Sequence, residues 1–265
     1  MNSAVLKKET LEQNLKNLGK IAIAFSSGVD STYLLKTAHN ILGDNVIAIT
    51  ARACCFPKKE TDEAEEFCKK EGIKQIFIDF SPLEIEEFRN NVKNRCYHCK
   101  KALFSTIKEI AGDNGFSTVA EGTNFDDLSD FRPGMKAIKE LDIISPLLDA
   151  ELTKNEIRFL SEEAGLSTFD KPSYACLASR VAYGEEITEE KLLMVERAEN
   201  KLFSLGINQS RVRVHGNLAR IEVCKDDFLK LLMACDEVND CLKELGFTFV
   251  SMDLEGYKTG NMNVY

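Results

Sequence analysis

Over the first two-thirds of the chain, short apolar runs rich in Ile and Val alternate with amphipathic segments. Strands of about five to eight residues that alternate with helical patterns of about ten to fifteen residues are typical of βαβ units wound around a parallel sheet. The sequence therefore predicts an α/β fold with a doubly wound parallel sheet. The expected strands are 20–25, 45–53, 74–80 and 117–123, and the expected helices are 31–42, 58–72 and 152–165. Thr153 and Glu156 have the spacing of a capping box, and Gly165 is a helix stop signal.

The pattern changes after residue 172. The expected helices are 188–205 and 226–245, and the expected strands are 210–216, 219–225 and 247–254. This order is typical of an α+β domain rather than of continued βαβ winding. We therefore expect a first domain at 1–172 and a smaller α+β domain at 173–265, because 265 residues are enough for two buried cores.

The composition limits which binding partners and which cellular compartment we expect for the chain. The formal net charge is -9, which argues against a nucleic-acid substrate, because such binding depends on Lys and Arg neutralising phosphates. The sequence has no long apolar run and no secretory signal at its start. We therefore predict a cytoplasmic protein without a membrane span, whose nine cysteines are thiols or metal ligands in a reducing compartment.

The segment FSSGVDS at 25–31 joins a predicted strand to a predicted helix. A short Ser/Gly loop in this position can present backbone N–H groups and the positive end of a helix to a phosphate. The loop is not a Walker A motif, because no G-K-[ST] follows it. The same segment is also compatible with a tight βα connection in which a serine acts as N-cap.

This loop resembles the S-G-G-x-D-S signature of the PP-loop ATP pyrophosphatases, which split ATP between its α- and β-phosphates. The matching residues are Ser26, Ser27, Gly28, Asp30 and Ser31. The resemblance implies that the serines and amides hold pyrophosphate and that Asp30 lies near Mg²⁺. Ser27 replaces the first glycine of the signature, and a positive φ at this position would cost about 1 kcal/mol for a serine.

Three further blocks resemble the LarE family of PP-loop sulfurtransferases: 121–137, 170–180, and 211–223 together with 252–263. The resemblance implies an enzyme that uses ATP and Mg²⁺ to insert sulfur into a pyridinium dicarboxylate mononucleotide, a precursor of the nickel-pincer nucleotide cofactor. It also implies a homo-oligomer, a sulfide or other sulfur donor, and an ATP site that includes Gly122, Thr123 and Asp127. Asp126, Asp127 and Asp130 form an acidic cluster that is either a Mg²⁺ or ribose site or a solvated turn.

Cys96 and Cys99 form a C-x-x-C motif in NRCYHCKKALF. With Cys176, they supply three thiolates, which suit an iron–sulfur cluster with one open iron better than structural zinc, which prefers four ligands. The resemblance implies a 4Fe-4S cluster that delivers sulfide to the adenylate. In many members of the family the cysteine that aligns with Cys176 instead gives up its own sulfur. The motif is also compatible with a zinc site completed by His98 or His215, with a dithiol relay, and with plain core thiols. We expect Cys68, Cys235 and Cys241 to be core or surface thiols.

Arg211 and Arg213 alternate along a predicted strand and therefore share one face of it. Such a pair can hold a substrate phosphate, although a solvent-facing strand would show the same spacing. The resemblance adds Arg180 to this phosphate site. The competing functions are a PP-loop tRNA thiolase, which the acidic charge argues against, and a regulator that binds a nucleotide or metal without catalysis.

Overall fold

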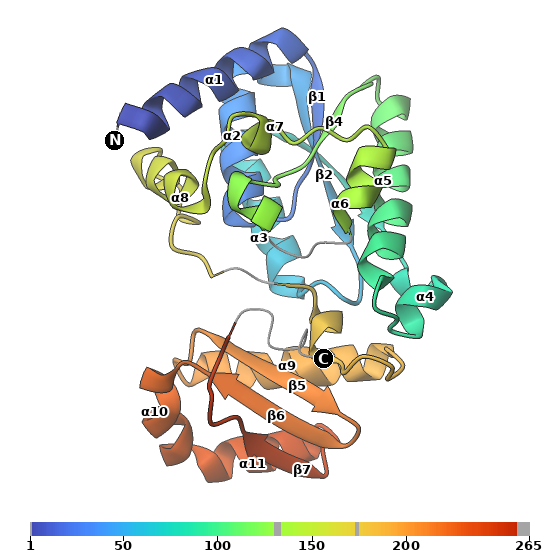
Figure 1. The fold of residues 1–265 in the computed structure, drawn as a ribbon, viewed down its shortest axis with the longest axis vertical. Coiled ribbons are helices and arrows are strands. Elements are labelled where there is room, and N and C mark those ends of the chain that lie inside the picture. The colour runs from blue at the N-terminus through green and yellow to red at the C-terminus, as the bar shows by residue number, and fades with distance from the viewer. Residues whose placement is uncertain (1, 130–133, 173–174, 259–265) are drawn as a thin grey trace. The chain divides into compact units, whose positions relative to one another are not determined.

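The computed structural model describes residues 2–129, 134–172 and 175–258. Figure 1 shows the elements in chain order. The chain forms two compact units, one made of residues 1–80 and 96–174 and the other of residues 81–95 and 175–265. The division into two domains at residue 172 stays a prediction.

The first unit contains a parallel sheet with strand order β3-β2-β1-β4. Its strands are β1 (Ile21–Ala24), β2 (Val46–Arg52), β3 (Lys74–Asp79) and β4 (Val119–Ala120). Ile21 lies opposite Val46, and Ala22 lies opposite Val119. The predicted strand at 117–123 is only two residues long. Ala120 also forms a parallel bridge with Ile144, whose carbonyl accepts a hydrogen bond from the Glu121 N–H at 3.0 Å.

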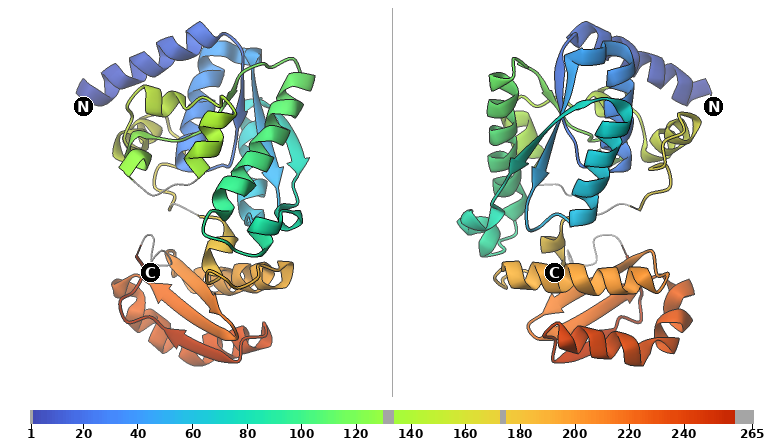
Figure 2. Two further views of the ribbon diagram at one scale, coloured as in Figure 1. Left: turned by 45° about the vertical axis from the view of Figure 1, so that its right-hand side comes forward. Right: turned by 180° about the vertical axis from the view of Figure 1, so that it is seen from behind.

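Helices cover both faces of this sheet (Figures 1 and 2). One core cluster joins Ile21 and Ile23 to α1 (Asn2–Leu18), α2 (Val29–Leu42), α3 (Lys58–Glu71), α7 (Pro146–Asp149) and α8 (Lys154–Glu163). A second cluster joins Ala22 to α5 (Arg95–Asp113) and α6 (Gly134–Glu140). Alternate residues of β1 therefore pack against different helix layers, which confirms the predicted α/β fold with its doubly wound sheet.

Helix α8 has the predicted capping box. Thr153 Oγ1 accepts a hydrogen bond from the Glu156 N–H at 3.3 Å, and Glu156 Oε2 accepts one from the Thr153 N–H at 3.0 Å. Glu156 also pairs with Lys7 of α1 at 2.8 Å. The cap therefore ties α8 to α1 as well as starting its own helix.

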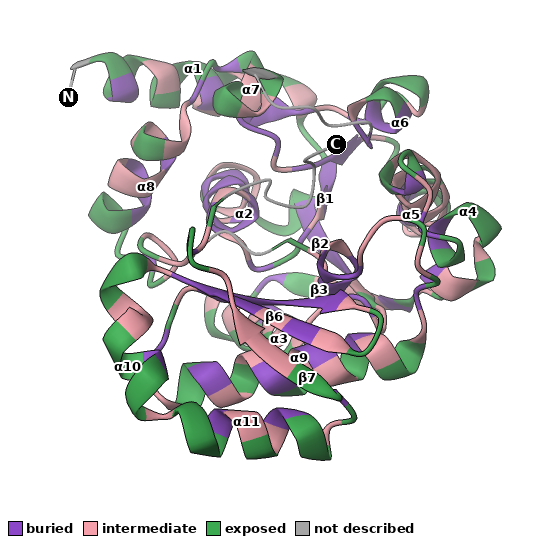
Figure 3. Cartoon of the chain, turned by 60° about the horizontal axis from the view of Figure 1, so that its bottom comes forward, coloured by how far each residue is buried: buried purple, intermediate pink, exposed green. Residues whose placement is uncertain are grey.

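The second unit contains a mixed sheet of order β5-β6-β7. Strands β5 (Ser210–His215) and β6 (Leu218–Val223) are antiparallel, and β7 (Phe249–Met252) runs parallel to β6. The helices are α4 (Glu86–Arg89), α9 (Glu189–Ser204), α10 (Phe228–Met233) and α11 (Cys235–Glu244). The predicted helix at 226–245 is thus broken at Ala234, and Figure 3 shows exposed surface along α10 and α11.

Short 3₁₀ helices fill some of the connections. They are Gly43–Asn45, Pro82–Glu84, Phe125–Ser129, Leu177–Arg180 and Lys225–Asp227. In the part of the chain that the structure describes, no helix is both long enough and apolar enough to cross a membrane.

The turn from β1 into α2 contains a residue with positive φ. Ser27 has φ 55°, the left-handed region that favours glycine. Its side chain is buried, and its Oγ donates to the Glu60 carbonyl at 2.8 Å. Lys171 Nζ donates to the Ser27 carbonyl at 3.0 Å and pairs with Glu63 at 2.5 Å. These contacts hold the turn in a conformation that a serine by itself disfavours.

We expect Lys171→Met to lower the free energy of unfolding by about 1 to 2 kcal/mol, because the Ser27 carbonyl and Glu63 lose a charged hydrogen-bond donor. In a Ser27→Gly background the same change should cost less by at least about 0.5 kcal/mol, because glycine keeps a positive φ without support. Urea unfolding of the four variants measures this coupling.

Lys59→Met is the matched control, since Lys59 approaches the same Glu63 at 3.9 Å from an exposed position. It should change stability by less than about 0.5 kcal/mol. An equal cost of Lys171→Met in both backgrounds would contradict the view that this lysine supports the serine.

Candidate functional site

The predicted phosphate loop lies at the carboxyl end of β1. Gly28 is the N-cap of α2 and has no side chain to satisfy the first N–H groups of the helix. The hydroxyl oxygens of Ser26 and Ser31 lie 3.2 Å apart, and Ser31 Oγ donates to the Gly28 carbonyl at 3.2 Å. The arrangement leaves the positive end of α2 facing the loop, as an anion site requires.

A second loop follows β4, the neighbour of β1 on the side away from β2. A Cβ on Gly122 would lie 3.0 Å from the Ser31 backbone nitrogen, so any other residue here would push the two backbones slightly apart. Thr123 is buried, and its Oγ1 donates to Glu121 Oε2 at 2.8 Å. The chain leaves β1 towards β2 on one side and reaches β4 on the other, and parallel sheets bind ligands at such a switch in strand order.

Asp30, in the first turn of α2, connects these two loops. Its Oδ2 lies 2.6 Å from Lys154 Nζ, and its Oδ1 accepts from Asn124 Nδ2 at 3.4 Å. Asp127 Oδ2 accepts from the Asn124 N–H at 3.1 Å. The structure therefore brings Asp30, Gly122 and Asp127 together through contacts with Asn124 and Lys154.

The aspartates of the acidic cluster have different hydrogen-bond partners. Asp126 accepts from the Lys154 N–H at 2.8 Å, while Asp127 accepts from Asn124; Asp130 lies outside the described residues. Mg²⁺ in nucleotide sites is usually held by one or two carboxylates together with substrate phosphates. Asp30 at the mouth of the loop fits this requirement, and its carboxylate is at present balanced by the Lys154 ammonium.

Cys96 and Cys99 lie in the first turns of α5. Cys96 is exposed and Cys99 is half-buried, and their spacing of three places both on one side of the helix. Cys176 is half-buried and belongs to the second unit, where it precedes the 3₁₀ helix Leu177–Arg180. The described ranges contain no group of three or more Cys, His, Asp or Glu residues that could hold a metal ion.

The C-x-x-C pair thus fits two cluster ligands on one helical turn, while its third ligand stays a prediction. His98 stacks edge-on against Tyr97 with ring centroids 5.2 Å apart, and His215 ends β5. Burial lowers the pKa of His215, which favours the neutral imidazole that binds zinc. Cys68 is a core thiol as predicted, and burial raises its pKa to about 12.

Arg180 is fully buried and is held by two oxygens of one carboxylate. Its Nε and Nη2 each lie 2.9 Å from a Glu199 oxygen. Its Nη1 donates to the carbonyls of Ala175 and Cys176, the latter at 3.0 Å. Burial alone would lower the pKa of Arg180, but Glu199 outweighs this effect and raises it. Arg180 therefore fixes the backbone on both sides of the Cys176 side chain.

Arg211 and Arg213 lie on one face of β5, as predicted, and both are buried rather than facing solvent. Arg213 pairs with the fully buried Glu222 at 2.8 Å and donates to the Ser179 carbonyl at 3.2 Å. The Arg211 guanidinium lies 5.1 Å from the Tyr257 ring. Burial and the nearby Arg180 and Arg213 lower the pKa of Arg211, so the local field favours an added anion.

The sequence did not reveal the partners of these residues. Lys154, Lys171 and Asn124 surround the loop of the first unit, and Glu199 and Glu222 hold the arginines of the second. Asn124, Lys171 and Glu222 lie inside the blocks 121–137, 170–180 and 211–223, which was a signal for their importance. Lys154 and Glu199 lie outside these blocks and come close to the site only through the fold. The roles predicted for the site residues stay predictions.

Comparisons with known proteins place the chain in a family. No model of a known protein family matches it. It is 40% identical over 259 residues to an uncharacterised protein of Synechocystis, with 97% of each chain covered. It is 36% identical over 264 residues to the pyridinium-3,5-bisthiocarboxylic acid mononucleotide synthase of Lactiplantibacillus plantarum, covering 99% of this chain and 96% of the synthase.

A more distant match links the fold to other enzymes. A subunit of the glutamine-hydrolysing GMP synthase of Thermoplasma volcanium is 27% identical over 205 residues, covering 70% of this chain and 63% of that protein. The predicted family is confirmed by the match with the mononucleotide synthase, which spans nearly the whole of both chains. The chain belongs to the LarE family of PP-loop, ATP-dependent sulfurtransferases and is an enzyme.

Proposed function

We propose that the enzyme uses ATP to adenylate a carboxylate of a pyridinium dicarboxylate mononucleotide and then replaces the activated oxygen with sulfur. The product would be a thiocarboxylate on the path to a nickel-pincer nucleotide cofactor. The observation that carries the proposal is the uncapped start of α2 beside Asp30, at the carboxyl end of a parallel strand. The name of the Lactiplantibacillus plantarum relative, a bisthiocarboxylic acid mononucleotide synthase, supports the substrate class.

Adenylation solves a problem of reactivity. A carboxylate repels a nucleophile and would have to expel oxide. When its oxygen attacks the α-phosphate of ATP, pyrophosphate leaves and a mixed anhydride with AMP forms. Sulfide or a thiolate can then attack the carbonyl carbon and expel AMP, and the oxygen leaves with the phosphate. With sulfide the products are a thiocarboxylate, AMP and pyrophosphate. A thiolate first gives a thioester, and the thiocarboxylate is released only when the bond from the sulfur to the protein side chain is broken.

The first unit would bind ATP. The backbone N–H groups of Gly28 and of the first turn of α2, with Ser26 and Ser31, would hold the β- and γ-phosphates that leave as pyrophosphate. Asp30 would hold Mg²⁺, which supplies positive charge against the departing pyrophosphate. Gly122 allows the second loop to approach the start of α2. Thr123, fixed by Glu121, and Asp127, fixed by Asn124, would line the nucleotide site.

The second unit would bind the substrate phosphate. Arg180, Arg211 and Arg213 are buried side chains whose charges are balanced in part by Glu199 and Glu222. The lowered pKa of Arg211 indicates that an anion beside it would be favourable. Arg180 also holds the carbonyl of Cys176. A substrate anchored by its phosphate would then be presented to a residue already fixed in place.

For the sulfur we propose a 4Fe-4S cluster held by Cys96, Cys99 and Cys176. The C-x-x-C pair on one side of α5, with Cys96 exposed and Cys99 half-buried, supports the first two ligands. An iron that lacks a protein ligand would supply bound sulfide as the nucleophile. The alternative is a sacrificial Cys176, whose thiolate attacks the adenylate and whose sulfur is then eliminated to leave dehydroalanine.

We also propose an oligomeric state and a sulfur donor. Exposed apolar side chains gather on α10, where Leu229, Leu232 and Met233 are 74%, 53% and 90% exposed. Large exposed apolar patches mark contact surfaces, so this helix supports the predicted homo-oligomer. Free sulfide or a protein that delivers it would be the sulfur donor.

We expect ATP, Mg²⁺ and the mononucleotide substrate to give AMP and pyrophosphate rather than ADP. Asp30→Asn should slow this by at least about a hundredfold, because charge stabilisation by the metal is worth several kcal/mol. Asp44→Asn, at an exposed carboxylate after α2, should leave the rate unchanged. Chromatography of the nucleotides measures both rates. ADP and orthophosphate as the first products would refute the proposed reaction.

We expect Arg211→Ala to weaken binding of the mononucleotide by about ten- to a hundredfold, because a charge-assisted hydrogen bond is worth about 1.5 to 3 kcal/mol. ATP affinity should not change. Arg197→Ala, at an exposed position on α9, is the matched control. Calorimetric titration measures both ligands, and an equal loss of affinity for both would show that Arg211 supports the fold or the nucleotide instead.

We expect protein reconstituted without oxygen to contain about four irons per chain and to absorb broadly in the visible range. Cys96→Ala, Cys99→Ala and Cys176→Ala should each lose the iron, while Cys235→Ala, at an exposed cysteine of α11, should keep it. Iron analysis and spectra provide the measurement. With sulfide present, each chain should make more than one product, and Cys176 should keep its mass.

The sacrificial mechanism gives the opposite result. Iron-free protein would form product once per chain, and Cys176 would lose about 34 Da as hydrogen sulfide. Finding this mass loss in step with the product would reject the cluster and leave the adenylation step standing.

A further inference from the structure

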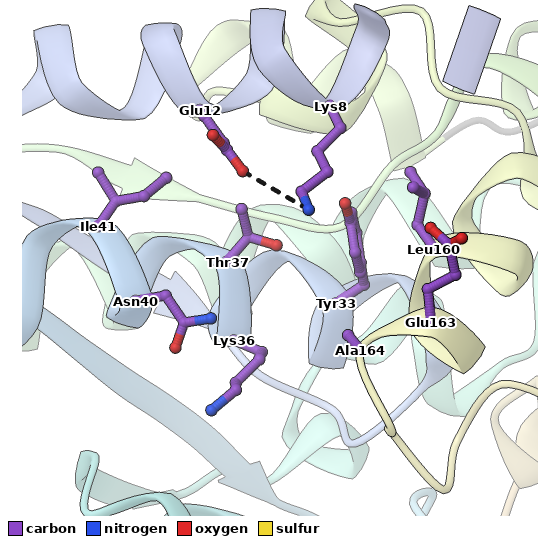
Figure 4. Close-up of a pocket in the computed structure, with 10 residues that line it drawn as sticks. All are labelled: Lys8, Glu12, Tyr33, Lys36, Thr37, Asn40, Ile41, Leu160, Glu163 and Ala164. Atoms are coloured by element: carbon purple, nitrogen blue, oxygen red, sulfur yellow. Dashed lines mark ion pairs between the residues drawn. The ribbon is translucent and has the colours of Figure 1, made fainter. Parts of the chain in front are cut away.

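A pocket of about 450 Å³ opens among α1, α2 and α8 of the first unit. On α2 its lining runs from Tyr33, two residues after the phosphate loop, to Ile41 near the end of the helix. The floor is buried, and the rim is exposed or half-exposed. Its lining is Lys8, Glu12, Tyr33, Lys36, Thr37, Asn40, Ile41, Leu160, Glu163 and Ala164, as Figure 4 shows.

The side chain of Tyr33 lies in the floor of this pocket, and its hydroxyl group is buried. Tyr33 is only 3% exposed, and its oxygen has no hydrogen-bond partner among the described residues. Thr37 is near enough to affect the pKa of Tyr33, but the geometry of the two hydroxyls does not make a hydrogen bond. A buried hydroxyl without a partner is costly and uncommon, unless a ligand or ordered solvent completes it.

Tyr33 can act only as a neutral group at ordinary pH. Burial raises its pKa to about 12, and the nearby carboxylates of Glu12 and Glu163 add to this effect. The hydroxyl therefore keeps its proton and is available to donate it to an oxygen of a ligand.

The two lysines of the pocket form different ion pairs. Lys36 pairs with Glu71 at 2.5 Å, and Figure 4 shows its ammonium group pointing away from the pocket. Lys8 lies 3.9 Å from Glu12 in an exposed pair, which is weak and easily rearranged. In Figure 4 the Lys8 ammonium and the hydroxyls of Tyr33 and Thr37 point into the pocket. One available cation and two hydroxyls therefore stand beside two carboxylates.

We propose that this pocket binds a small zwitterion, a free α-amino acid, separately from the nucleotide and substrate sites. The ligand carboxylate would lie against Lys8 and accept from the Tyr33 hydroxyl. The ligand ammonium would lie between Glu12 and Glu163. Leu160 and Ile41 would contact its side chain.

The charged groups and hydroxyls of the pocket favour a zwitterion over a simple anion or a simple amine. A simple anion would use Lys8 but would face both carboxylates, and a simple amine would leave the Tyr33 proton without an acceptor. The volume lies within the range of about 300 to 1,000 Å³ found for small-molecule pockets, so an amino acid fits with room for its side chain.

Thermal shift and calorimetric titration of the full chain, without ATP, test the proposal. The probes are a panel of the common amino acids at millimolar concentration, with propionate and ethylamine as the half-ligands. At least one amino acid should raise the unfolding temperature and titrate as one site, and neither half-ligand should match it. No binding by any amino acid, or equal binding by a half-ligand, would overturn the proposal.

Variants locate the binding. Tyr33→Phe should weaken binding of the amino acid by about tenfold. The ligand-free variant should unfold at the same or a higher temperature, because the unpaired hydroxyl is gone. Lys8→Ala should also weaken it, whereas Lys16→Ala, at an exposed position on the same helix, should not. Unchanged affinity in Tyr33→Phe would show that the ligand binds elsewhere and would reject this site.

Discussion

Strand β1 is buried on both faces, and the geometry of the first unit depends on this burial. Ile21 and Ile23 pack into one helix layer and Ala22 into the other, all with no exposed surface. The carboxyl end of the strand is therefore fixed, and so is the turn that leaves it. The positive φ of Ser27 can exist there because neighbouring groups hold it: the Glu60 carbonyl, Lys171 and, through Lys171, Glu63. A loop that binds phosphate by its backbone needs such a fixed shape before its ligand arrives.

The parts of the fold that the sequence predicted correctly are those with a strong local period. Strands β1, β2 and β3 are runs rich in Ile, Val, Ala or Phe. Helix α3 is charged at every position except Thr61, Ala64, Phe67 and Cys68. Helix α8 carries its own start signal in Thr153 and Glu156. Helices α1 and α5 were not predicted. Leu11 and Leu15 of α1 are fully buried, but most of its other positions are polar, so only its packing on the sheet reveals the stripe.

The sequence predicted the motif residues of the candidate site but not the charged residues that pair with them. The loop residues and Gly122 have local signatures, and the structure places them together. Their counter-charges lie far away in the sequence: Lys154 is 124 positions from Asp30, and Lys171 is 144 positions from Ser27. Glu199 and Glu222 read in the sequence as ordinary charges on a helix and a strand, yet each binds an arginine that is almost fully buried. Such pairs are fixed by tertiary packing, which a single sequence does not report.

The arginine cluster shows why overall charge is a poor guide to a local site. The chain carries a net charge of -9, yet its second unit buries Arg180, Arg211 and Arg213. Arg180 also donates a hydrogen bond to the Cys176 carbonyl. Burying three guanidiniums requires compensation. Glu199 and Glu222 supply two negative charges, and Arg220 draws on Glu222 as well. Burial, together with the nearby charges of Arg180 and Arg213, lowers the pKa of Arg211. Bulk water screens the field of buried charges poorly, so a net charge that opposes a long polyanion is compatible with the single phosphate site that we propose.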